Sequence, residues 1–329
     1  MGAGGTNDIL LDEPIRPNQI VMNNGSYCPI MGMGTDCITK DEHIDIVYQS
    51  IKDGIRLIDT EPKNEIIVGK AIKRAIDDGI VRREDLFIIT KLELDEKEDP
   101  EKAIRESLGR LQVNKIDLYL DHWPSCRNYK NQKKLIPVKD TWLKMEELVR
   151  KNLTKGIGVS NYNAENLLNI LSILPNRNSI KPCAIEVEFH PYLYQKDLKE
   201  LCDKENIVLF AYNPLCKGQY CDRIFLQERN YDLFTEAPIM YLSEKYFENQ
   251  KYKNTDRYHI TKGQIILNWH MRLGVVPIPG TLNKDRMKEN LVATKFSISD
   301  SIIKLLCSYN QRQHRFKDGS DIFGYDIFG

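Results

Sequence analysis

Long hydrophobic runs are missing from this 329-residue sequence, which nowhere reaches the roughly 18 consecutive apolar residues of a membrane-spanning helix. The N-terminal residues also lack a cationic segment followed by an apolar core, so they do not have the pattern of a secretory signal peptide. We therefore expect a cytoplasmic protein with no membrane partner.

An excess of one charge sign and closely paired cysteines are missing as well. Lys plus Arg and Asp plus Glu each total 47, so the basic surface expected of a nucleic-acid-binding protein is not predicted. The eight cysteines form no Cys-x-x-Cys pair, which favours reduced thiols over disulfides or a zinc centre. We expect a small-molecule substrate, no nucleic-acid partner and no metal site; the oligomeric state is not predicted.

A complete Gly-x-Gly-x-x-Gly fingerprint after a strand is also absent, and Gly32-Met33-Gly34 is only half of one. A doubly wound dinucleotide-binding sheet is therefore the minor alternative. What the sequence does contain is an alternation of short β-branched runs with segments of helical period, which is typical of parallel βα units. The eight strands expected are Tyr27–Met33, Ile55–Ile58, Leu86–Thr90, Ile116–Leu120, Gly156–Val159, Ala184–Glu188, Val208–Ala211 and Val275–Ile278.

Helix start signals fall between these strands. Thr39 to Glu42 predicts a capping box, and Asp99-Pro100 predicts an N-cap followed by proline at the first helical position. Eight parallel strands, each followed by a helix, predict an α/β protein with a (β/α)8 TIM barrel. Further helices are expected at Val138–Leu153, Ala164–Leu174, Gln195–Asn206, Lys262–Leu273, Asp285–Thr294 and Ser299–Tyr309.

The predicted organisation is one barrel domain over residues 19–329, preceded by a flexible N-terminal extension over residues 1–18. The alternation stops between 216 and 260, where we expect a surface insertion. Residues 311–329 are expected to form a C-terminal substrate loop, because loops after the strands set specificity in barrels. The substrate itself is not predicted.

Polar and ionisable residues recur at the predicted carboxyl ends of the strands, where TIM barrels carry their functional groups. Each one alone has an ordinary explanation, such as a buried core histidine or a solvated loop end. Together, in register with a barrel, they predict a site. They are Asp59, Lys91, His122, Ser160, Asn161, Glu186 and Tyr212.

Several segments around these positions are specific enough to indicate a family. They are Gly32–Thr35, Gly54–Thr60, Ile89–Leu92, Asp117–Pro124, Gly158–Tyr162, Glu188–Tyr192, Ala211–Leu215 and the stretch from Ile278 through Arg286 to Asn290. By these segments the chain resembles the aldo-keto reductases from Asn23 to Phe328. The resemblance implies NADP(H) as cofactor and the reduction of aldehydes or ketones to alcohols.

The resemblance also implies how the nicotinamide is held. Tyr212 would stack on the ring, while the Ser160 and Asn161 side chains would bind its carboxamide. The family has a glutamine as third carboxamide contact where this chain has Glu186, and an ionised carboxylate accepts hydrogen bonds but cannot donate them. We therefore expect a weakened or re-oriented grip on the nicotinamide.

Further cofactor contacts follow from the same resemblance. Thr281 and Arg286 would bind the 2′-phosphate of NADP, since the forked donors of arginine suit a phosphate. Glu289 and Asn290 would contact the adenine, and NADP(H) is expected to be preferred over NAD(H). Thr35, Asn213 and Leu215 complete the set of cofactor-binding residues.

One departure affects the chemistry. In the family, a tyrosine in the loop after the second strand gives a proton to the carbonyl oxygen, tuned by a lysine and an aspartate. Lys91 and Asp59 match that pair, but the loop Asp59-Thr60-Glu61-Pro62-Lys63-Asn64-Glu65 is shorter and contains no tyrosine. Glu61 and Lys63 are expected to be solvated beside Pro62.

Three hypotheses follow. The leading one is an NADP(H)-dependent carbonyl reductase of reduced efficiency, with Asp59, Lys91 and His122 as catalytic residues and His122 or Lys91 as the proton donor. The second is a catalytically inactive NADP(H)-binding pseudoenzyme with a sensing or scaffold role. The third is that residues near Glu61 were lost through an error in the gene sequence.

Overall fold

The computed structural model describes residues 9–10, 14–15, 18–124, 136–174, 178–216, 233–248, 260–312 and 315–317. Eight strands form one sheet in the order β11-β10-β9-β8-β7-β6-β5-β4, with parallel pairing throughout. The ring closes where Gly32 N–H donates to the Pro277 carbonyl at 3.0 Å and Gly34 N–H donates to that of Pro279 at 3.2 Å. The predicted (β/α)8 barrel is confirmed. Its strands are β4 (Met33–Gly34), β5 (Leu57–Asp59), β6 (Phe87–Leu92), β7 (Ile116–Asp121), β8 (Thr154–Ser160), β9 (Ala184–Glu188), β10 (Val208–Tyr212) and β11 (Val276–Pro277).

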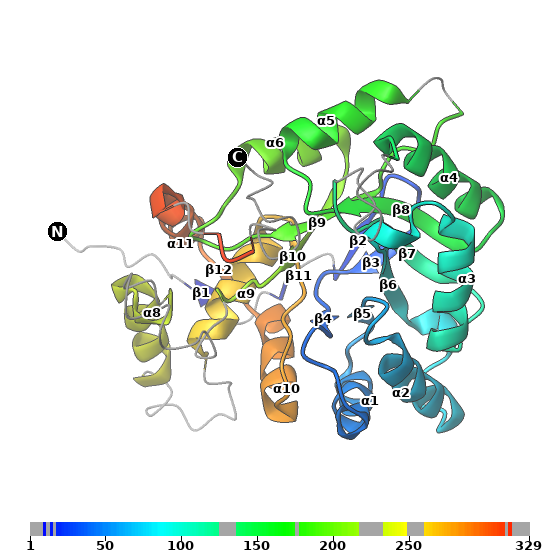
Figure 1. The fold of residues 1–329 in the computed structure, drawn as a ribbon. Coiled ribbons are helices and arrows are strands. Elements are labelled where there is room, and N and C mark those ends of the chain that lie inside the picture. The colour runs from blue at the N-terminus through cyan, green and yellow to red at the C-terminus, as the bar shows by residue number, and fades with distance from the viewer. Residues whose placement is uncertain are drawn as a thin grey trace.

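Helices surround the strands on the outside (Figure 1). The six helices predicted by range are present, with ends that differ from the prediction by no more than one turn. α8 lies within the predicted insertion and packs against α9. The helices are α1 (Ile44–Asp53), α2 (Glu65–Asp77), α3 (Pro100–Leu111), α4 (Val138–Arg150), α5 (Ala164–Ile173), α6 (Lys196–Glu205), α8 (Ala237–Glu248), α9 (Lys262–Arg272), α10 (Lys284–Val292) and α11 (Asp300–Ser308).

Strand side chains are buried on both faces, which explains why the strands read as continuous apolar runs. In β6 every residue is buried. Ile89 belongs to the cluster inside the barrel, whereas its neighbour Ile88 belongs to the layer between strands and helices. Successive side chains along a strand point to opposite faces, so every second residue points into the barrel. At the carboxyl end of each strand, these inward-pointing residues face the site at the barrel mouth.

Two local predictions were wrong. Tyr27–Pro29 (β3) does not belong to the first barrel strand but pairs antiparallel with Gln19–Val21 (β2), because Gly25 takes a positive φ of 80° and turns the chain. Thr39 does not form the capping box; its N–H donates to Nδ1 of His43 at 3.1 Å. The Asp99 cap is confirmed, with its carboxylate accepting from Lys102 N–H at 3.0 Å.

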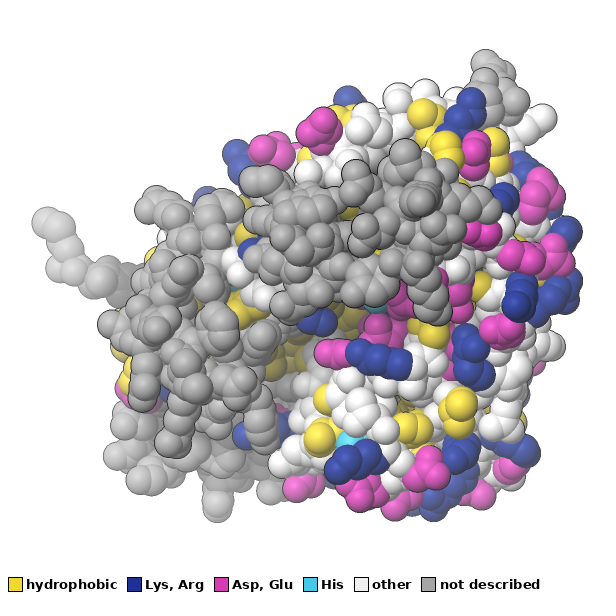
Figure 2. Space-filling model, viewed as in Figure 1, with side chains coloured by type: hydrophobic (Ala, Val, Ile, Leu, Met, Phe, Trp, Pro, Cys, Tyr) yellow, Lys and Arg dark blue, Asp and Glu magenta, His cyan; other side chains and the backbone are white. Residues whose placement is uncertain are grey.

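The N-terminal extension is not wholly separate from the barrel. Ile9–Leu10 (β1) pairs with Ser297–Ile298 (β12), and Ile15 N–H donates to the Thr294 carbonyl. Among the described helices, none has the length and apolar character needed to cross a bilayer. Charged side chains of both signs are interspersed over the coloured part of the face shown in Figure 2, as the balanced composition predicts.

Candidate active site at the carboxyl ends of the strands

Lys91 lies at the centre of a buried charged cluster. Its Nζ is 2.5 Å from Oδ1 of Asp59 at the end of β5 and 3.3 Å from Oε1 of Glu186 in β9. It also donates to the Thr60 carbonyl at 3.1 Å. The ammonium therefore donates hydrogen bonds to Asp59 and Thr60 and forms an ion pair with Glu186.

The cluster contains two carboxyl groups and one ammonium. Burial raises the pKa of Asp59 well above its ordinary range, and the neighbouring Glu186 raises it further against the opposing effect of Lys91. Burial disfavours the charge on Lys91, yet Asp59 and Glu186 together raise its pKa above the usual value. Lys91 is therefore held as a cation between two carboxyl groups.

The shortened loop without tyrosine is a closed turn. Asn64 N–H donates to the Glu61 carbonyl at 2.9 Å, with Pro62 at the position that turns favour for proline. The Asn64 amide donates to the Thr35 carbonyl at 2.7 Å, and fully buried Glu65 pairs with Nε of Arg110 at 2.5 Å. Asn64 and Glu65, which match the family pattern, therefore serve to anchor the loop and α2.

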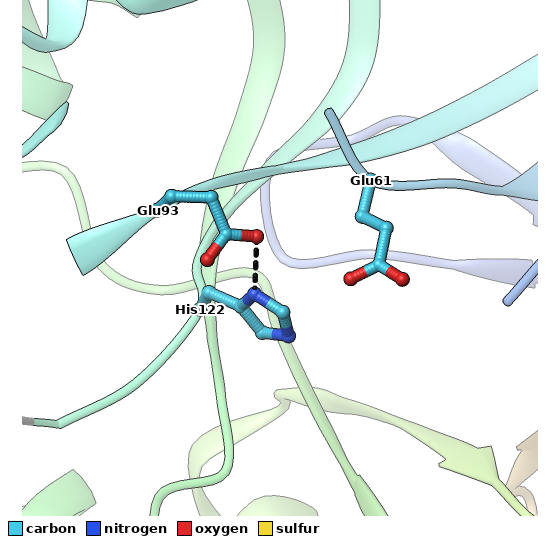
Figure 3. A group of neighbouring side chains, drawn as sticks. All are labelled: Glu61, Glu93 and His122. Atoms are coloured by element: carbon cyan, nitrogen blue, oxygen red, sulfur yellow. Dashed lines mark hydrogen bonds and ion pairs between the residues drawn. The ribbon is translucent and has the colours of Figure 1, made fainter. Parts of the chain in front are cut away.

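His122 follows β7 and contacts a residue that the sequence analysis did not single out. Its Nδ1 lies 2.7 Å from Oε1 of Glu93, the residue after β6 (Figure 3). The hydrogen bond to His122 lowers the pKa of Glu93, although burial acts in the opposite direction. Among the described residues, Nε2 of His122 has no hydrogen-bond partner.

Glu61 completes this group and corrects a prediction. Its side chain is only 16% exposed and lies on the same side of the barrel mouth as His122 (Figure 3). Lys63 is 56% exposed and pairs with Glu61 at 2.6 Å. Donor atoms of Glu61, Glu93 and His122 lie within 4.8 Å of one another. Because Glu61 already pairs with Lys63 and Glu93 with His122, we assign no metal ion to the group.

The residues expected to hold the nicotinamide lie together on the adjoining strands. The Tyr212 hydroxyl at the end of β10 donates to Oδ1 of Asn161 at 2.8 Å, and the Asn161 amide donates to the His122 carbonyl at 3.0 Å. The Ser160 hydroxyl donates to the Glu186 carbonyl at 3.0 Å. Asn161 takes a positive φ of 61°, a conformation that asparagine tolerates better than most residues.

The tail after α11 is fastened to the same mouth through Glu188. This fully buried carboxylate accepts from the amide of Asn213 at 2.7 Å and from the N–H groups of Phe316 and Lys317, each at 2.9 Å. Lys317 thereby places its ammonium 5.6 Å from the centre of the Tyr212 ring. The rest of the predicted substrate loop lies outside the described residues.

The predicted adenosine-phosphate residues form a second group around α10. The Asn283 side chain caps this helix by accepting from the N–H of Arg286 at 3.2 Å, and Thr281 accepts from Asn283 N–H at 3.1 Å. Glu289 accepts from the Thr261 hydroxyl at 2.6 Å, and Asn290 is buried. Gly280 bridges to Gly34, so the loop carrying this group lies beside β4.

Two of the residues predicted to bind the cofactor, Thr35 and Leu215, lie closer to the core. The Thr35 hydroxyl is buried and donates to the Asp59 carbonyl at 2.9 Å, which ties the end of β4 to the end of β5. Leu215 is half-buried against the outer hydrophobic layer. The contacts of these two residues are therefore those of side chains that position the surrounding loops.

Comparisons with known proteins agree with this geometry. The profile of the aldo/keto reductase family matches residues 30–310. An NAD(P)H-dependent D-xylose reductase of Pyricularia oryzae is 31% identical over 334 residues, covering 94% of this chain and 98% of that protein. Aldo-keto reductase family 1 member A1-A of Danio rerio is 32% identical, covering 92% and 94%. The crystal structure of a Bombyx mori aldo-keto reductase in complex with NADP superposes with a TM-score of 0.81 at 29% identity, covering 94% of this chain and 98% of that one.

Proposed function

The chain belongs to the aldo/keto reductase family, and from this premise we propose that it is an NADP(H)-dependent oxidoreductase that reduces small aldehydes or ketones to alcohols. The observation that carries the proposal is the arrangement of Asp59, Lys91 and His122 opposite Tyr212 at the mouth of one barrel. We further propose that the protein acts in the cytoplasm as a single barrel domain.

The residues present fit the cofactor. Oε2 of Glu186 is buried, and no described residue hydrogen-bonds it, so it offers an acceptor for a carboxamide nitrogen. Arg286, in the first turn of α10, has the donor geometry that a phosphate requires. Bound NADPH would supply the hydride, while Tyr212, Ser160 and Asn161 would orient the nicotinamide.

The remaining requirement is a proton at the carbonyl oxygen as negative charge develops there. His122 is the candidate, because imidazole titrates near neutrality and its Nε2 is not engaged by any residue that the structure describes. We expect the barrel to bind the substrate with its oxygen toward this nitrogen and its carbon toward the nicotinamide.

The test is a fluorescence titration of the purified protein with NADPH, followed by absorbance of the reduced nicotinamide after addition of a reactive aromatic aldehyde. Binding with turnover is the expected result. Binding without turnover would replace the proposal with the inactive NADP(H)-binding alternative, which the missing tyrosine and Glu186 motivate. If NADPH does not bind, the protein shares the fold of the family but not its cofactor binding.

A further inference from the structure

We propose that Glu93 and His122 form a carboxylate–histidine pair that delivers the proton in place of the missing tyrosine, with Glu93 as the positioning residue and Glu61 as the second carboxylate facing the imidazole. This inference rests on the proposed carbonyl reduction and names the group that completes it.

Lys91 is excluded as the donor by its own contacts. Its Nζ donates to Asp59 at 2.5 Å and to the Thr60 carbonyl at 3.1 Å, and it forms an ion pair with Glu186 at 3.3 Å. Transfer of a proton would leave a neutral amine buried between two carboxyl groups. Lys91 therefore acts through its field rather than as an acid.

His122 has the opposite geometry. The bond from Nδ1 to Glu93 fixes the ring and assigns one proton to that nitrogen, so the second nitrogen, Nε2, points to the site. Glu93 can hold this position because its backbone is extended, with φ −77° and ψ 161°, which places its side chain on the same side as that of Lys91 two residues earlier.

Two carboxylates approach the imidazole from different sides. Glu93 approaches from the end of β6, and Glu61 approaches from the loop after β5 (Figure 3). The cations nearby, Lys63 on Glu61 and Lys91 between Asp59 and Glu186, each have carboxylate partners of their own. From β8, Asn161 contributes a neutral amide to the His122 carbonyl. An opposite charge at this range stabilises an imidazolium.

The step balances with the proposed cofactor. As hydride adds to the carbonyl carbon, the π-electron pair moves to oxygen, and that oxygen takes the proton from Nε2 of His122. The C–H bond of the cofactor and the Nε2–H bond of the imidazolium would break as new C–H and O–H bonds form on the substrate, and bound NADPH would supply the two electrons and become NADP⁺. Neutral His122 keeps the Nδ1 proton toward Glu93 and regains its other proton from solvent.

The experiment compares Glu93→Gln with the wild type, and uses Glu205→Gln as the control because Glu205 pairs with Lys181 away from the site. The variables are kcat against pH, the dissociation constant of NADPH, and the pKa of His122 by NMR. Because the reaction needs the imidazolium, kcat falls as pH rises through its pKa. In Glu93→Gln we expect this decline of kcat to begin at lower pH, with kcat at pH 8 down roughly tenfold.

The NADPH dissociation constant is expected to stay the same. Glu93→Asp, which keeps a carboxylate, is expected to restore much of the wild-type dependence of kcat on pH. An unchanged dependence of kcat on pH and an unchanged NMR titration in Glu93→Gln, with normal wild-type turnover, would overturn this inference alone. No turnover in the wild type would remove the proposed function and this inference with it. Loss of activity with a chelator would also overturn it, in favour of an ion among Glu61, Glu93 and His122.

Discussion

Nζ of Lys91 lies 3.3 Å from Oε1 of Glu186, at a position where the family resemblance implies a glutamine amide. The substitution places a second carboxyl group on an ammonium that already serves Asp59. Burial and the proximity of Glu186 together raise the pKa of Asp59, so the departure in β9 alters the same site whose loop after β5 contains no tyrosine. The two changes are physically coupled through Lys91.

Glu186→Gln is expected to tighten NADPH binding. An amide both donates and accepts toward the nicotinamide carboxamide, whereas an ionised carboxylate only accepts. One added hydrogen bond of about 1 kcal/mol corresponds to roughly a fivefold lower dissociation constant. Fluorescence titration measures it, with Glu205→Gln as the control. A dissociation constant that stays the same or rises would show that Glu186 does not face the carboxamide.

Arg286→Met is expected to weaken NADPH binding by roughly 10- to 100-fold, as charge-assisted hydrogen bonds to a phosphate contribute about 1.5–3 kcal/mol. NADH has no 2′-phosphate for Arg286 to bind, so the same substitution should change the dissociation constant of NADH by less than about threefold. Titration with both cofactors separates the two effects. Equal weakening toward NADPH and NADH would place Arg286 away from the 2′-phosphate.

Gly158→Ala is expected to destabilise the barrel, whereas Gly109→Ala stabilises it. A Cβ at Gly158 would lie 2.4 Å from the Ala184 carbonyl oxygen of the neighbouring strand, while a Cβ at exposed Gly109 in α3 would meet nothing within 4 Å. We expect a loss of at least about 1–3 kcal/mol at the first site and a gain of about 0.5–1 kcal/mol at the second. Urea unfolding measures both, and similar effects at the two sites would contradict the close approach of β8 and β9.

The barrel was predictable because each strand and helix carries its own local signal, as in β6, where an apolar run ends at Lys91. The first strand was misjudged because the apolar residues Tyr27–Met33 give no sign that the turn at Gly25 assigns Tyr27–Pro29 to a hairpin. Glu93 was missed for a different reason. The sequence shows that Glu93 lies two residues after Lys91 and so shares its face of the strand. Its contact with His122, however, joins two strand ends that are 29 residues apart in the sequence, and no local pattern indicates it.

Glu61 shows the same limit. Glu61 lies two residues after Asp59, yet the polar residues around Pro62 predict a solvated turn. Only the structure, with its closed turn from Glu61 to Asn64, shows that the carboxylate is mostly buried. The sequence places strand ends at one edge of the barrel, but it does not determine which neighbouring side chains form pairs there. That information belongs to the packing of the loops.

Arg110→Met is expected to cost about 3–5 kcal/mol, because it leaves the carboxylate of Glu65 buried without its cation. Glu65 is fully buried, and besides Nε of Arg110 at 2.5 Å it accepts from the Thr90 hydroxyl at 2.6 Å. The matched control is Asp77→Asn, which breaks the exposed pair with Lys73 and should cost less than about 0.5 kcal/mol. Equal costs by urea unfolding would contradict the role of Glu65 as the anchor of α2.

His270 is expected to make the protein lose stability in mild acid. It is buried, with Nδ1 2.8 Å from the Ile266 carbonyl and Nε2 2.9 Å from the Phe189 carbonyl. Burial lowers its pKa to about 4, against the opposing effect of the two carbonyls.

Because the folded pKa of His270 lies below the ordinary value near 6.5, its contribution is fully present above about pH 6.5 and is lost as pH falls toward 4. At about 1.4 kcal/mol per unit, the loss approaches roughly 3 kcal/mol. In His270→Gln, whose amide does not titrate, the free energy of unfolding should fall less over that range. Since the variant also changes a buried contact, the comparison is between slopes rather than absolute stabilities. Equal slopes would show that a group other than His270 takes up the proton.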